Sequence, residues 1–311
     1  MDKYLPEGLL FEKDRLGVKM QDEKFIIQAY RDGRCLEARA VMCDSGHNLH
    51  FRFGAVRGFM PYEECAEGIR EGTQKDIAII SRVNKLTGFY ITDLVTEETG
   101  EITAILSRTK RQKECRENYI SQLVPGDIID ARITHLEPFG AFCDIGAGIN
   151  ALLPIDSISV SRIPDPSARF KTGDDIKCAV RCIDADGRIT LSHKELLGSW
   201  EENAALFSEG ETVTGIIRSV ESYGVFVELM PNLAGLAEYV PEASAGRSAS
   251  VFIKSINPSK MKIKLIIVDT DEHIFRKKTK YFVSCGHLDF WQYSPENSSR
   301  KIYTDFTVSP F

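Results

Sequence analysis

Two short runs of the chain carry aromatic side chains at the same spacing. Phe139 and Phe142 in the first run are matched by Tyr223 and Phe226 in the second, 84 positions later in each case. A flat ring on a protein surface has two common uses. It stacks on a nucleic-acid base, or it is buried against a neighbouring domain.

Strand alternation predicts which way these rings point. Phe142 lies on the strand face opposite Ala141 and shares its own face with Asp144. A carboxylate is unfavourable inside a small barrel, so we expect Asp144 and Phe142 to face outward. Phe226 and Glu228 repeat the pattern, so the same ring position is expected to be outward twice.

Basic side chains near the rings would attract phosphate groups. Each one taken alone is more often a solvated surface charge, whereas several of them gathered on one face would form a surface for phosphate. Strand alternation predicts that four of them face outward: Arg132, Lys177, Arg181 and Arg218.

The aromatic runs belong to a longer repeat. Gly126 is matched by Gly210 at the same offset of 84, and a more diverged copy lies upstream, where Phe59 aligns with Leu152. We name the copies repeat A (residues 25–93), repeat B (residues 122–197) and repeat C (residues 207–268).

Each repeat alternates short apolar strands with glycine-containing turns, which is typical of a small antiparallel barrel. In repeat B we expect strands at residues 128–135, 141–145, 150–153, 175–183 and 188–192. Five strands in about seventy residues fit an OB-fold, whose strand face binds oligonucleotides, and this favours base stacking. The predicted fold is all-β, with three tandem five-stranded OB-fold barrels.

The segments between the repeats differ from them in composition. Residues 107–121 contain no glycine or proline and many basic residues, which predicts a basic helix joining A to B. Residues 194–207 predict a second short helical link. Residues 269–311 are rich in aromatic side chains and predict a β-rich extension, whose role the sequence does not indicate.

The composition is that of a folded, soluble protein, with 43% hydrophobic and 27% charged residues. No apolar run is long enough for a membrane span and the first residues lack a signal-peptide core, so we expect a cytoplasmic protein without membrane contact. The net charge of -6 argues against coating of duplex nucleic acid by charge alone.

The sequence offers no constellation for catalysis. It contains no HExxH motif, no phosphate-binding loop and no nucleophile with a paired base, so we expect no enzymatic activity and no cofactor. The eight cysteines form no CxxC pair, and Cys178 and Cys182 fall on the inner parity of one strand. We therefore expect buried apolar cysteines and no metal site.

Several motifs together resemble the S1 RNA-binding domain, an OB-fold named after a bacterial ribosomal protein. They are the G-D-x(3)-A-R-I-T run, F-G-A-F-C-D-I-G, F-K-T-G-D and I-D-A-D-G-R-I-T-L-S, all in repeat B. The resemblance covers most of residues 25–268, and three such repeats in tandem look like a short bacterial S1 protein.

The resemblance implies an RNA face made by two aromatics, a histidine, an aspartate and an arginine. The matching residues in repeat B are Phe139, Phe142, Pro154, Asp184 and Arg188, so proline departs from the pattern. In repeat C they are Tyr223, Phe226, Glu238, Asn257 and Lys262. Because a carboxylate would repel phosphate there, we expect a weaker or differently tuned site in C.

Repeat A aligns Gly46 and Leu49 with the two aromatic positions, which predicts that it lacks the ring pair. Such repeats resemble those that dock onto ribosomal protein rather than RNA. Phe51 and Phe53 would suit such a protein contact, or they belong to the core.

The leading hypothesis is binding of single-stranded mRNA in support of translation at the small ribosomal subunit. Repeats B and C would hold the RNA and repeat A a protein partner. The alternatives are a regulatory or scaffold protein, or an accessory RNA-binding subunit of an RNA-processing complex.

Overall fold

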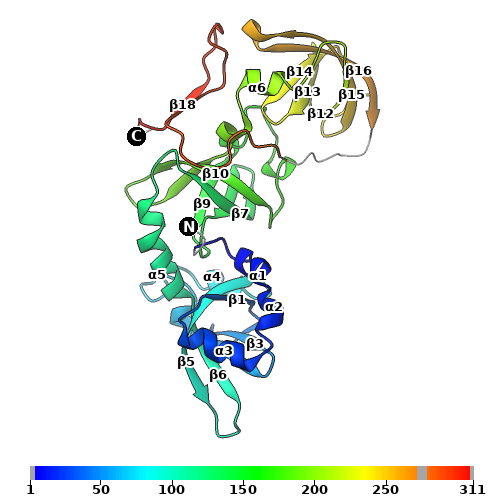
Figure 1. Cartoon of the computed structure of the whole chain (residues 1–311). Coiled ribbons are helices and arrows are strands. Elements are labelled where there is room, and N and C mark those ends of the chain that lie inside the picture. The colour runs from blue at the N-terminus through cyan, green and yellow to red at the C-terminus, as the bar shows by residue number, and fades with distance from the viewer. Residues whose placement is uncertain (1–3, 272–278, 309–311) are drawn as a thin grey trace. The chain divides into compact units, whose positions relative to one another are not determined.

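The computed structural model describes residues 4–271 and 279–308, so parts of the predicted extension, 272–278 and 309–311, lie outside the described residues. The chain divides into two units, coloured by residue number in Figure 1. Unit 1 comprises residues 1–123 and 144–150, and unit 2 comprises residues 124–143 and 151–311.

Unit 1 begins with three short helices and continues with a sheet of six strands in the order β1-β5-β6-β4-β3-β2. Asp22 caps the third helix, because its side chain accepts the backbone N–H of Lys24. The helices are α1 (Leu9–Lys13), α2 (Leu16–Lys19) and α3 (Glu23–Arg31), with η1 (Tyr62–Glu64) and α4 (Ile77–Ile80) between later strands. The strands are β1 (Leu36–Arg39), β2 (Met42–Cys43), β3 (Leu49–Phe53), β4 (Val56–Met60), β5 (Leu86–Thr96) and β6 (Ile102–Ser107).

The sheet of unit 1 is curled but is not the closed five-stranded barrel that we predicted for repeat A. Its edge strands β1 and β2 are two halves of one chain segment, which pair with β5 and β3 respectively. The break falls at Ala40, which bridges Val83 instead. An unbroken first strand would pair with both β5 and β3. The interruption at Ala40 prevents this, so the sheet stays open.

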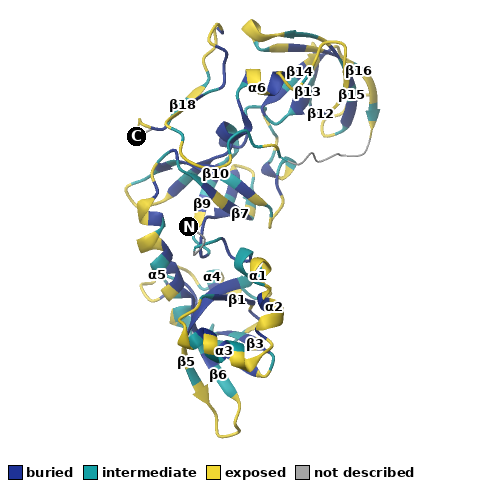
Figure 2. Cartoon of the chain, viewed as in Figure 1, coloured by how far each residue is buried: buried dark blue, intermediate teal, exposed yellow. Residues whose placement is uncertain are grey.

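The core of unit 1 explains two aromatic residues of repeat A. Phe51 and Phe53 are buried and both contact Phe89, with ring centroids 5.3 and 5.7 Å apart. The alternative that they belong to the core is therefore correct. Buried residues alternate with more exposed ones along β3, and Figure 2 colours the chain by burial.

Repeat B forms a closed barrel with the strand order β10-β11-β9-β8-β7. Its strands are β7 (Ile128–Glu137), β8 (Gly140–Asp144), β9 (Asn150–Pro154), β10 (Asp175–Ile183) and β11 (Ile189–Ser192), with η3 (Ile155–Ser157) and η4 (Pro166–Ala168) between β9 and β10. Cys143, Cys178 and Cys182 are buried, as the strand parity predicts for apolar cysteines.

Repeat C forms a second closed barrel, with the order β12-β13-β14-β16-β15. In contrast to unit 1, its first strand is unbroken, since Ile216 pairs with both Glu228 and Ser248 on its two neighbours. The strands are β12 (Thr212–Glu221), β13 (Gly224–Met230), β14 (Leu233–Ala237), β15 (Ser248–Asn257) and β16 (Lys262–Asp271), with η6 (Pro258–Lys260) before the last.

Short helices join the repeats, as predicted: α5 (Arg108–Asn118) and η2 (Ile120–Gln122) before barrel B, then η5 (Lys194–Leu197) and α6 (Trp200–Ala204) before barrel C. Ser199 and Glu202 form a capping box at the start of α6. The all-β class with tandem OB-fold barrels is thus confirmed for B and C, with an open sheet in place of the first barrel. No described helix is long and apolar enough to cross a membrane.

The C-terminal extension packs on both barrels of unit 2. It contains the strand pair β17 (Phe290–Gln292) and β18 (Tyr303–Asp305). Trp291 and Tyr293 join the core of barrel C. On barrel B, the Tyr281 hydroxyl accepts the backbone N–H of Lys177 at 3.0 Å and lies 3.2 Å from Nε2 of His193. The extension therefore supports the fold of unit 2.

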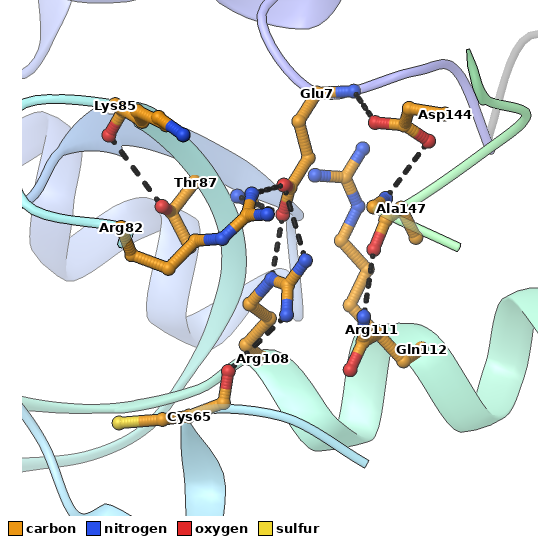
Figure 3. Close-up of polar contacts among 12 residues, drawn as sticks. Glu7, Cys65, Arg82, Lys85, Thr87, Arg108, Arg111, Gln112, Asp144 and Ala147 are labelled. Carbon is orange, nitrogen blue, oxygen red and sulfur yellow. Dashed lines mark hydrogen bonds and ion pairs between the residues drawn. The ribbon is translucent and has the colours of Figure 1, made fainter. Parts of the chain in front are cut away.

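A buried network of charges holds unit 1 together (Figure 3). The Glu7 carboxylate accepts from Nε of Arg108 at 2.7 Å and from Nη1 of Arg82 at 2.8 Å. Arg111 donates to Glu37 at 2.9 Å. Two basic residues of the predicted linker helix, Arg108 and Arg111, are therefore buried ion-pair partners rather than surface charges.

Candidate nucleic-acid interface

The two predicted aromatic pairs have nearly the same geometry in the two barrels. The rings of Phe139 and Phe142 lie edge to face at 6.1 Å and 90°, and those of Tyr223 and Phe226 at 6.2 Å and 86°. The first ring of each pair is exposed, at 55% for Phe139 and 68% for Tyr223. The second ring is half-buried. Each barrel thus presents one open ring supported by another.

A glycine between the two rings lets the strands approach closely. A Cβ on Gly140 would lie 2.5 Å from the carbonyl oxygen of Leu153, and one on Gly224 would lie 2.5 Å from that of Ala237. Both contacts are too short for any side chain, so the aromatic-Gly-x-aromatic spacing follows from the meeting of two strands. The same backbone constraint fixes the ring pair in each barrel.

Phe142 and Phe226 lie outside the buried core, as strand alternation predicts, but the expectation that the carboxylates beside them face outward is wrong. Asp144 and Glu228, which we expected to be exposed on the ring face, are both buried. Asp144 accepts backbone N–H groups of Glu7, Gly146 and Gly148 at 2.7 to 3.0 Å. These donors satisfy the oxygens of the buried carboxyl, and alternation along the strand cannot reveal them.

Glu228 is satisfied in a different way. Arg218 donates to both of its carboxylate oxygens at 2.8 and 3.0 Å, and Arg169 also donates to both. Burial opposes the charge of Glu228, but the two guanidinium groups outweigh it and lower the pKa of this carboxyl. Arg218 is therefore committed to an internal ion pair, and the prediction that it faces outward is wrong.

Two other predicted basic residues are also paired with carboxylates. Arg132 donates to both oxygens of Asp175 at 2.7 and 2.9 Å, and Lys177 donates to Asp130 at 2.6 Å. These partners lie across the β7 and β10 pairing, and they offset the positive charge that we assigned to phosphate binding. Arg181 donates to the Ser157 hydroxyl at 3.2 Å.

The residues near the last turn of each barrel divide into structural and exposed ones. Asp184 accepts the backbone N–H groups of Asp186 and Arg188 at 2.9 and 2.8 Å, so it shapes the turn between β10 and β11. The side chain of Arg188 is 79% exposed, with a surface contact to Asp186 at 3.4 Å. Lys262 is exposed at the start of β16.

Strand register identifies a residue that the sequence analysis missed. In barrel C, Phe226 pairs with Leu236, which in turn pairs with Lys264 on β16. Lys264 is exposed, so a ring, an apolar side chain and an ammonium group follow one another across three strands. In barrel B, Leu152 pairs with Thr190 at the matching place. We call Phe226, Leu236 and Lys264 the barrel C strip.

The register also corrects the alignment of repeat A. Phe59, which matches Leu152, pairs with His50 rather than with Leu49. His50 therefore occupies the place of Phe142, and the prediction that repeat A has no ring there is wrong. The turn between β3 and β4 is one residue shorter than its counterpart in barrel C, since His50 pairs with Phe59 nine positions later and Phe226 with Leu236 ten positions later, so the offset at β3 is 92.

Among the described residues, no group of three or more histidine, cysteine or acidic side chains could hold a metal ion.

Comparison with known proteins finds a family model that matches part of the chain. Residues 123–194 match the model of the S1 RNA binding domain, which confirms the resemblance found in repeat B. The small ribosomal subunit protein bS1 of Leuconostoc lactis is 26% identical over 282 residues, covering 85% of this chain and 62% of that protein. The bS1 homolog of Bacillus subtilis is 29% identical over 175 residues, covering 52% of this chain and 45% of its own length.

The chain thus spans less than two thirds of the length of these relatives. Among solved structures, a multidomain protein with nucleic acid binding domains from Streptococcus pneumoniae is 12% identical, with 76% of this chain and 74% of that chain covered and a TM-score of 0.25.

Proposed function

We propose that this chain, whose residues 123–194 match the model of the S1 RNA binding domain and which is similar to bS1 proteins, binds single-stranded RNA on the outer faces of barrels B and C. The observation that carries the proposal is the recurrence of one edge-to-face ring pair at the same place in both barrels. Two independent copies with an open ring are better suited to repeated ligand units than to a single packing contact.

The rings would supply affinity without reading sequence. Every base has a flat face, and one stacked base contributes about 1 to 3 kcal/mol. Phe139 and Tyr223, which are the exposed members of the pairs, would take the bases. Arg188, Lys262 and Lys264 would meet the phosphates, because they are exposed and lie at or after the last turn of each barrel.

The overall charge of -6 limits non-specific attraction to nucleic acid. Binding should therefore be moderate in strength and tolerant of sequence, and it should weaken as salt rises, since each neutralised phosphate releases counterions. We infer a role in binding rather than catalysis, in the cytoplasm.

The test is fluorescence anisotropy of a labelled U-rich RNA with the full chain. A Phe139→Ala, Tyr223→Ala variant should bind at least about 5-fold more weakly for each stack lost, while its thermal unfolding stays near that of the wild type because both rings are exposed. Phe290→Ala is the matched control, because Phe290 is also a surface aromatic, 50% exposed on β17. A folded wild type without RNA affinity would refute the proposal.

The names of the relatives suggest where the RNA is met. We propose that the chain associates with the small ribosomal subunit and supports translation of mRNA there, as the name bS1 indicates for its relatives. Co-sedimentation of the chain with isolated small subunits measures this directly. RNA affinity without co-sedimentation would keep the binding function and reject the ribosomal one.

A further inference from the structure

The curled sheet of unit 1 carries a ring and charge pattern on the face that corresponds to the ring faces of barrels B and C. The ring of His50 on β3 meets that of Phe59 on β4 edge to face, with centroids 5.4 Å apart and 63° between the planes. Both side chains are partly exposed. Across the sheet, Phe59 pairs with Ile105 just as Leu236 pairs with Lys264 in the barrel C strip.

The next register position distinguishes this face from those of B and C. Arg52 pairs with Arg57, at the place where barrel C pairs Glu228 with Ala234. Both arginines are exposed, whereas Glu228 is buried. Unit 1 therefore has two surface cations where barrel C has one buried anion.

Two like charges directly opposite each other on neighbouring strands destabilise a sheet. Only one of these two is balanced: Arg57 pairs with Glu101 at 2.6 Å, and both partners are about half exposed. In the part of the chain that the structure describes, no carboxylate pairs with Arg52. A bound anion between the two guanidinium groups would relieve the repulsion, because arginine holds phosphate oxygens through several N–H groups.

The carboxylates near this face do not prevent anion binding. Asp44 accepts from His50 at 2.9 Å and also from the backbone N–H groups of Gly46 and Asn48. Its charge is thus used to fold the loop and to hold the imidazole in place. The pairing of Arg57 with Glu101 is a solvent-exposed salt bridge, which contributes only about 0 to 1 kcal/mol and can be exchanged for a phosphate.

We propose that His50, Phe59, Arg52 and Arg57 form a third site for single-stranded RNA, with bases on the rings and a phosphate on the arginines. This inference rests on the proposed function and extends it to a repeat that we expected to contact protein. The flat rings and the adjacent uncompensated guanidinium favour a polyanion with stacking bases over a basic protein segment.

The experiment uses the full chain and a labelled U-rich RNA of about 30 nucleotides, which is long enough for three OB-type faces. Arg52→Gln, Arg57→Gln should reduce the slope of log affinity against log salt by about 0.7, since the two arginines hold one phosphate and each phosphate neutralised on a single strand adds about 0.7. His50→Gln, Phe59→Leu should weaken binding about 5-fold or more. Leucine is chosen because Leu152 and Leu236 occupy this position in B and C.

Arg39→Gln, Arg70→Gln is the matched control, since it removes the same charge from exposed positions of unit 1 outside this face. Cross-linking of RNA that contains 4-thiouridine gives an independent readout. We expect cross-links in the tryptic peptides of residues 40–52 and 58–70, which contain His50 and Phe59.

The outcomes separate this site from those of barrels B and C. If the wild type binds RNA and the Phe139→Ala, Tyr223→Ala variant loses affinity, but the changes at Arg52 and Arg57 have no effect, the third site is wrong and the proposed function stands. Reduced co-sedimentation with small subunits at unchanged RNA affinity would assign the face to protein and overturn the inference. A wild type without RNA affinity would overturn both.

Discussion

Glu7→Gln tests the buried charge network of unit 1. The substitution keeps the size of the side chain but removes the negative charge that Arg82 and Arg108 share (Figure 3). Its carboxylate also accepts the backbone N–H of Gly88 at 3.1 Å, a contact that the amide oxygen of glutamine can retain. The expected loss therefore reflects mainly the two guanidinium groups that remain buried without their anion.

The lowered pKa of Glu7 and the general cost of breaking a buried ion pair give similar magnitudes for this loss of stability. Burial opposes the charge of Glu7, but Arg108 and Arg82 outweigh it and lower its pKa from 4.5 to about 2. At about 1.36 kcal/mol per pKa unit, this difference corresponds to about 3 kcal/mol of stability at neutral pH. Removing one partner of a buried ion pair costs about 3 to 5 kcal/mol in general. We expect about 3 kcal/mol, or roughly 10 °C in the unfolding temperature of unit 1.

Hydrogen exchange followed by mass spectrometry can assign the loss to unit 1. Amides in α5 and β5 should exchange about 100-fold faster in the variant at pH 7, if exchange proceeds through opening of this unit. Amides of β15 and β16 in unit 2 provide an internal reference in the same molecules. Glu23→Gln is the matched control, because Glu23 is an exposed glutamate on α3.

The pH dependence of this loss of stability provides a second test. A carboxyl whose pKa is lowered by folding stabilises the protein above its unfolded pKa, and this contribution disappears as the pH falls through the folded value. In an Asp144→Asn background, where the neighbouring carboxyl does not titrate, the loss of stability on Glu7→Gln should therefore be constant above about pH 5 and shrink between about pH 4.5 and pH 2. A difference that does not change with pH, or equal losses in both units, would refute the electrostatic reasoning.

Three further predictions concern other buried polar groups. Burial and the charge of Glu7 raise the pKa of Asp144 to about 6, so the contribution of Asp144 to stability is full below about pH 4 and is lost as the pH rises through 6. The free energy of unfolding of Asp144→Asn, measured in urea, should not show this fall between about pH 4 and pH 6. Burial lowers the pKa of His193 to about 4, so hydrogen exchange should show barrel B losing stability as the pH falls from about 6.5 to 4. Tyr281→Phe removes the hydroxyl that contacts His193 and should lower the free energy of unfolding by about 1 kcal/mol at neutral pH. Glu228→Gln leaves two buried arginines without their carboxylate and should lower the stability of barrel C by about 3 to 5 kcal/mol in thermal unfolding, whereas unchanged stability would show that water compensates them.

Local patterns in the sequence were sufficient for much of the fold. The predicted strands of repeat B agree with β7 to β11 within two residues at each end, because the alternation of apolar residues and the glycine turns act over a few positions. The ring pairs were also visible in the sequence, since the aromatic-Gly-x-aromatic spacing records a close approach of two strands. The role of these rings in RNA binding stays a prediction.

Long-range pairing decided what the local patterns could not. Whether a charge is exposed depends on a partner that is distant in sequence: Asp175 for Arg132, Asp130 for Lys177, and Glu228 for Arg218. Strand parity gives a direction for each side chain but not the identity of its neighbour, so it treated all of these cations as available for phosphate.

Register is the second property that only the tertiary structure could supply. A shift of one residue in the alignment of β3 exchanges the two faces of that strand, and the observed register places His50 rather than Leu49 opposite Phe59. In the same way, the parallel pairing of β14 with β16 brought Lys264 beside Leu236. The sequence thus determined which repeats and rings this protein has. The folded chain determined which charges remain free beside those rings, because ion pairing and strand register depend on contacts between segments that are far apart in the chain.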